Sequence, residues 1–109
     1  MKVKELIETW EKHASTRLTA HELAVRLPLR DAARIAALAE MYPLRSEQEI
    51  ITELLSAALD ELETSLPYVQ GARVIAEDDQ GDPIYEDVGP TPRFHALTRK
   101  HLRRLESET

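Results

Sequence analysis

Residues 23–62 read LAVRLPLRDAARIAALAEMYPLRSEQEIITELLSAALDEL, and this stretch decides the fold because its hydrophobic period changes along it. From Leu23 to Leu29 every second residue is apolar, and a period of two predicts a β-strand. Pro28 has no N–H donor, so we place it at the end of the strand, where it leads into a helix.

Two helices are predicted after this strand. Apolar residues recur at spacings of three and four over residues 30–41, which predicts a short helix, and a turn at 42–45 follows it. Ser46 and Glu49 then have the spacing of a capping box, in which the serine oxygen accepts the N–H of Glu49 and the carboxylate accepts the N–H of Ser46. A longer helix is therefore expected from Ser46 to just before Pro67. Its apolar side is broad enough to face more than one neighbour.

Three further elements flank this stretch. Residues 3–14 have the apolar spacing of an amphipathic helix. Two apolar runs around the turn-forming residues 78–82 predict a β-hairpin, and Thr91-Pro92 predicts the start of a last helix. We expect a mainly α fold with a short β-ribbon, divided into an N-terminal helix (1–16), a strand with two helices (22–65), and the hairpin with the last helix (66–109).

The predicted strand has no partner in its own domain, because two helices separate it from the hairpin. Unpaired backbone groups are costly, and antiparallel pairing with the same strand of a second copy would satisfy them. We therefore expect an obligate homodimer. Its expected core combines the inward residues of the strand with the broad face of the longer helix: Leu23, Val25, Leu27, Ile51, Leu54, Leu55 and Leu59.

The strand, the short helix and the capped Ile/Leu-rich helix resemble the ribbon-helix-helix family of DNA-binding proteins, of the Arc and MetJ type, over residues 23–63. This resemblance implies that the ribbon of the dimer lies in the major groove of double-stranded DNA. With the apolar strand residues facing the core, the alternate residues Glu22, Ala24 and Arg26 would contact bases. The resemblance also implies a phosphate at the start of the second helix. The expected phosphate contacts are Arg30, Arg34, Arg45 and Ser46.

The charge distribution leaves a second interpretation open. The net charge is −6, with eight basic and six acidic residues in 1–45, one and twelve in 46–90, and five and two in 91–109. We expect the basic last helix to pack on its own protein with its charges toward the acidic segment. The function predicted is a transcriptional regulator. The alternative is a homodimeric protein-interaction module, antitoxin-like or an adaptor, that has lost DNA binding and meets a protein partner through residues 66–109.

The composition argues against other classes. The chain has no cysteine, which removes disulfides, thiolate metal ligands and a cysteine nucleophile. No HExxH motif and no pair of histidines at i, i+4 occurs among His13, His21, His95 and His101, so we expect no metal site. The chain has no nucleophile motif, and its three glycines are too few for a phosphate-binding loop, so we expect neither an enzyme nor a cofactor. No apolar run approaches the roughly 20 residues that span a bilayer, and the charged start differs from a signal peptide, which predicts a cytoplasmic protein without a membrane partner.

The whole chain is also similar to a group of small bacterial proteins without an established activity, some of them labelled type 1 pilus-tip components. The similarity includes VIAEDDQGDPIYEDVGPTPRF at residues 74–94. A pilus component has to be exported, which the charged start of the chain does not favour.

Overall fold

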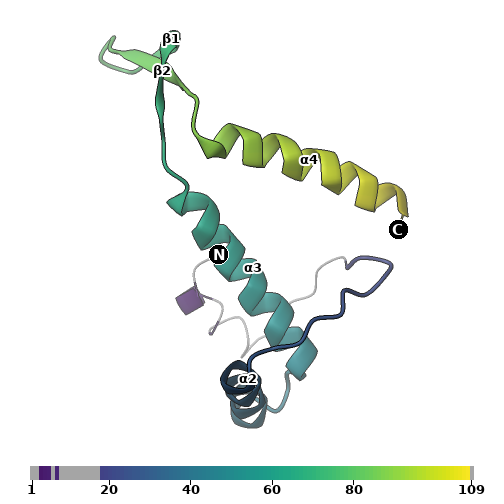
Figure 1. Ribbon diagram of the computed structural model, residues 1–109. Helices are drawn as coiled ribbons and strands as arrows, with labels where there is room; N and C mark the ends of the chain where they lie inside the picture. The colour runs from purple at the N-terminus through teal and green to yellow at the C-terminus, as the bar shows by residue number, and fades with distance from the viewer. Residues whose placement is uncertain (1–2, 6, 8–17, 109) are drawn as a thin grey trace. The chain divides into compact units, whose positions relative to one another are not determined.

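The computed structural model describes residues 3–5, 7 and 18–108 (Figure 1). Within them the fold is mainly helical with one small antiparallel sheet, as predicted. The elements are, in order, α2 (Leu29–Met41), α3 (Glu47–Ser65), β1 (Gln70–Glu77), β2 (Pro83–Asp87) and α4 (Pro90–Glu108). The chain forms two compact units, Met1–Thr64 and Ser65–Thr109. No helix in the described ranges is both long and apolar enough to cross a membrane.

The N-terminal part of the first unit is described only in places. Residues 3–5 and 7 are helical, and the remainder of the helix predicted over 3–14 lies outside the described residues. Residues 22–28 adopt neither a helix nor a ladder with any described residue (Figure 1).

The strand predicted over Leu23–Leu29 does not form in the single chain, where residues 22–28 pair with no described strand. Its last position, Leu29, is the first residue of α2. The reason is local. Pro28 occupies the N-cap position of α2 with φ −54° and ψ 147°, and its carbonyl accepts the N–H of Ala32 at 3.0 Å. This first helical hydrogen bond makes Leu29 helical, although its apolar side chain continues the period-two pattern.

The start of α3 confirms the predicted capping box. Ser46 Oγ accepts the N–H of Glu49 at 3.1 Å, and Glu49 Oε1 accepts the N–H of Ser46 at 3.2 Å. Two of the donors that a helix start leaves unpaired are thus satisfied by side chains four residues or fewer apart. The helix ends at Ser65, before Pro67, as expected.

The core of the first unit is small and lies along one side of α3. Ile50 and Ala57 are fully buried there. The partly buried apolar residues packed against them come from the N-terminal segment, from α2 and its C-terminal turn, and from α3: Val3, Ile35, Leu38, Ala39, Tyr42 and Leu54.

A second apolar side of α3 remains exposed in the single chain. We call it the outer face of α3 and define it by Ile51, Leu55, Leu59 and Leu62, which follow one another at spacings of four, four and three. Leu55, Leu59 and Leu62 are 57%, 46% and 51% exposed. Of the residues predicted for the dimer core, Leu54 packs on the core of its own chain, whereas Ile51, Leu55 and Leu59 lie on this outer face.

The second unit begins with the predicted hairpin. β1 and β2 pair antiparallel, with Val74 opposite Tyr85 and a register irregularity before Ala76. In the connecting turn, Asp78 Oδ1 accepts the N–H groups of Gln80 and Asp82, both at 2.9 Å. Gly81 in the same turn has a φ of 83°, a conformation that side chains with a Cβ disfavour. Local turn chemistry therefore sets the hairpin.

The last helix starts slightly earlier than expected. α4 begins at Pro90, whereas the sequence predicted Thr91 as the cap with Pro92 at the first helical position. Proline suits the first position of a helix, because its fixed φ is helical and its missing N–H has no helical partner there. A proline at 90 and another at 92 make both starts locally acceptable, and the helix takes the earlier one.

Candidate nucleic-acid interface

The segment before α2 contains the residues predicted to read bases. Glu22, Ala24 and Arg26 are exposed in the single chain. So are the apolar residues between them, since Leu23 and Val25 are 84% and 73% exposed. The segment therefore presents Leu23, Val25 and Leu27 to water beside backbone groups that pair with no described strand.

The arginines at the start of α2 differ in their surroundings. Arg30 is exposed and, like Arg26, makes no ion pair within the described residues. Arg34 is 66% exposed in its side chain and pairs with Asp31, one turn before it on α2. Exposed pairs of this kind contribute little stability, because water screens both charges. Arg34 can therefore exchange its carboxylate for another anion at small cost.

Arg45 has a different role from the one predicted. Its side chain is only 4% exposed, and Nη1 lies 3.1 Å from Glu49 Oε2 and 3.3 Å from Glu53 Oε1. The backbone N–H of Arg45 also donates to the carbonyl of Tyr42 at 2.9 Å, within the turn that joins α2 to α3. A guanidinium buried between two carboxylates holds this turn against α3, so we leave Arg45 out of the proposed phosphate contacts.

The sequence contained a signal for this arrangement. Residues 45, 49 and 53 are spaced by four, which places an arginine and two glutamates along one side of the helix that starts at Glu47. The prediction named Arg45 only as a phosphate contact and did not use this spacing. Among side-chain atoms of described residues, Glu53 Oε2 is buried without a hydrogen-bond partner.

The start of α3 is also less suited to a phosphate than the family resemblance implies. The backbone N–H and the side-chain Oγ of Ser46 are both hydrogen-bonded to Glu49. The hydrogen bond from the backbone N–H of Ser46 lowers the pKa of the Glu49 carboxyl, helped by the Ser46 hydroxyl and by Arg45. This carboxylate stays ionised at neutral pH beside Glu47 and repels a second anion. The structure gives Ser46 a capping role.

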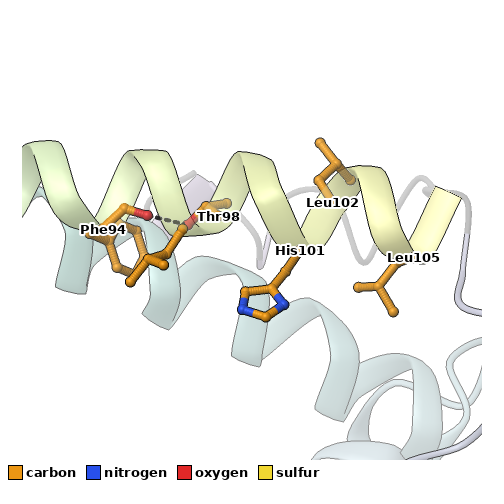
Figure 2. Close-up of a pocket in the computed structure, with 6 residues that line it drawn as sticks. Phe94, Thr98, His101, Leu102 and Leu105 are labelled. Atoms are coloured by element: carbon orange, nitrogen blue, oxygen red, sulfur yellow. Dashed lines mark hydrogen bonds between the residues drawn. The ribbon is translucent and has the colours of Figure 1, made fainter.

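α4 contributes the other exposed surface of note. Phe94, Leu97, Thr98, His101, Leu102 and Leu105 line a shallow groove, and all six residues belong to this one helix. In Figure 2, Leu102 points away from Phe94, His101 and Leu105, and we call the side of Phe94, Leu97, Thr98, His101 and Leu105 the apolar face of α4. Phe94, His101 and Leu105 point to the same side of the helix, and the hydroxyl of Thr98 donates to the carbonyl of Phe94 at 2.7 Å (Figure 2). The face is thus interrupted by two polar side chains.

In the described ranges, no group of three or more His, Asp or Glu side chains is arranged to hold a metal ion. The comparisons with known proteins give no match: no family model, no curated protein and no solved structure is similar to the chain. The function is therefore argued from the geometry of the chain itself.

Proposed function

We propose that the chain is a homodimeric ribbon-helix-helix DNA-binding protein that acts as a transcriptional regulator. The observation that carries this proposal is the segment 22–28. It alternates apolar and other residues, pairs with no described strand, and runs directly into α2, a tight turn and the capped helix α3.

Dimerisation follows from two features that one copy leaves unsatisfied. The first is the row of backbone groups in 22–28, which an antiparallel copy of the same segment would pair. The second is the outer face of α3, which exposes three leucines. A two-stranded ribbon alone is marginally stable in water, so the ribbon requires an apolar surface to cover it. A two-fold axis provides both the strand pairing and the apolar cover, because each copy then contributes the same strand and the same helix face.

The DNA-reading side follows from the parity of the strand. When Leu23, Val25 and Leu27 face α3 of the two copies, the intervening residues face away from the protein. Arg26 then offers the two parallel donors that suit guanine O6 and N7. Ala24 can contact a thymine methyl group, and Glu22 can accept from cytosine N4.

The positioning contacts come from the start of α2. Arg30 has no carboxylate partner among the described residues, and Arg34 has only the exposed Asp31. Both can bind phosphates of the backbone, which orient a protein without reading sequence.

A protein-interaction module is the second candidate, and the charge of the first unit favours it. Residues 1–64 carry eight Lys or Arg and twelve Asp or Glu. Such a surface repels a polyanion unless cations are concentrated where the DNA lies. In this alternative the same dimer forms, but its ribbon is solvated and the protein partner is met through residues 66–109.

Fluorescence anisotropy with a random-sequence duplex pool, followed by selected duplexes, over a salt series tests the proposal. Arg26→Ala should cost about 1–3 kcal/mol on the preferred site and relax discrimination at one base per half-site. Arg30→Gln should weaken binding to all duplexes alike and lower the salt slope by about one. Arg73→Gln, on the hairpin, is the matched control and should change neither. Absence of salt-dependent binding by the wild-type protein at about 50 µM would leave the interaction module as the function.

A further inference from the structure

The net charge of the first unit opposes DNA binding, because residues 1–64 carry eight Lys or Arg and twelve Asp or Glu. Arg45 is buried between two carboxylates, and Arg34 is paired with Asp31. Among the described elements, α4 has the largest concentration of cations. It carries five Lys or Arg and two Glu over Pro90–Glu108.

Three of the five cations of α4 lie away from its apolar face. Positions two apart in an α-helix lie on nearly opposite sides, because one turn takes 3.6 residues. Arg99 and Arg103 precede His101 and Leu105 by two, so they lie opposite the side to which those residues point (Figure 2). We define the basic face of α4 by Arg99, Lys100 and Arg103. Arg93 and Arg104 border the apolar face, since Arg93 lies four residues before Leu97 and Arg104 Nη2 lies 3.5 Å from His101 Nδ1.

This separation bears on how the helix is used. One neighbouring surface cannot cover both faces of α4, since they point in opposite directions. If Phe94, Leu97 and Leu105 pack on protein, as the sequence predicts, the basic face is left to solvent or to a second partner. The sequence also predicts that α4 packs on its own protein with its cations toward the acidic segment 46–90. For both to hold, one surface would have to cover the apolar face and a second, acidic surface the basic face.

The cations are available for a ligand. All five are exposed. Arg104 pairs with Glu108 at 3.4 Å, an exposed pair that contributes little. Within the described part of the chain, Arg93 and the three cations of the basic face have no carboxylate partner.

We propose that the basic face of α4 binds the phosphate backbone of duplex DNA without sequence preference. This inference rests on the proposed function. It explains how a chain with an acidic first unit gains affinity for a polyanion, because contacts to phosphates supply most of the sequence-independent binding energy. It also assigns α4 to anchoring the dimer, leaving sequence choice to Arg26.

DNA fits this helix better than an anionic membrane does. A helix that lies in a membrane surface inserts its apolar side and keeps cations along the border of that side, where they reach the headgroups. Arg93 and Arg104 border the apolar face of α4, but Arg99, Lys100 and Arg103 lie away from it. The apolar face is also interrupted by Thr98 and His101.

The test compares the full chain with Arg99→Gln/Lys100→Gln/Arg103→Gln in the anisotropy salt series. Gln, Lys and Arg have similar helix propensities, so the helix should be retained, which circular dichroism checks. The salt slope should fall by about two to three per bound chain, and affinity for random duplexes at about 0.1 M salt should fall tenfold or more. Arg99→Lys/Arg103→Lys is the charge-preserving control and should keep the wild-type slope.

Other outcomes decide between the two proposals. A wild-type slope and affinity in the triple Gln variant would overturn the role of α4, while a loss of base discrimination in Arg26→Ala would still support the ribbon. A reduced slope in the triple variant, with unchanged discrimination in Arg26→Ala, would support α4 and reject the ribbon. Binding of the wild-type protein to vesicles containing phosphatidylserine, without binding to duplexes, would overturn the DNA assignment of α4.

Discussion

Substitution of Leu55 distinguishes an obligate dimer from a folded monomer better than substitution of a core residue does. Leu55 lies on the outer face of α3 and is 57% exposed in the single chain. Fully burying a leucine contributes about 1.5–3 kcal/mol, so the part of Leu55 already covered accounts for roughly 1 kcal/mol in a monomer. If a second copy covers the remainder, Leu55→Ala also leaves a cavity, and the loss should reach about 2–4 kcal/mol per chain.

The assay is urea unfolding at two protein concentrations a hundredfold apart, with sedimentation equilibrium on the same samples. In an obligate dimer the unfolding midpoint rises with concentration, and Leu55→Ala should dissociate and unfold in one step. Leu54→Ala is the matched control, because Leu54 packs on its own core and should cost about 2–5 kcal/mol in either case. A folded wild-type monomer at micromolar concentration, with a loss near 1 kcal/mol for Leu55→Ala, would refute the dimer.

Two predictions concern the start of α3. Glu49→Gln keeps the hydrogen bonds of the capping box and removes the charge. Because the pKa of Glu49 is lowered in the folded state, the wild-type protein should have the higher unfolding free energy at neutral pH, and this difference should disappear as the pH falls below about 4. A difference that stays constant down to about pH 2 would contradict this prediction. Arg45→Met should destabilise the first unit by about 3 kcal/mol, since it leaves Glu53 buried without its cation, and Arg45→Met/Glu53→Gln should recover part of the loss in urea unfolding. A stable Arg45→Met protein with a lower salt slope for DNA would instead return Arg45 to the phosphate contacts.

The sequence by itself determined the features that depend on neighbours a few residues apart. The capping box at Ser46 and the turn of the hairpin were predicted from residue types at fixed spacings, and both are present. The helix starts differ from the predictions by one or two residues. A cap or a turn closes its hydrogen bonds within about four residues, so the local sequence contains all the groups involved.

Only the tertiary structure decided which apolar side of α3 the chain covers by itself. Periodicity marked α3 as apolar over a wide arc, but it could not separate Ile50 and Ala57, which are buried, from Leu55 and Leu59, which are not. The position of α2 makes that choice. The burial of Arg45 also depends on the tertiary structure, because its side chain lies against Glu49 and Glu53 of α3. Burial and ion pairing depend on what neighbouring elements cover, and residue spacing along one element does not contain that information.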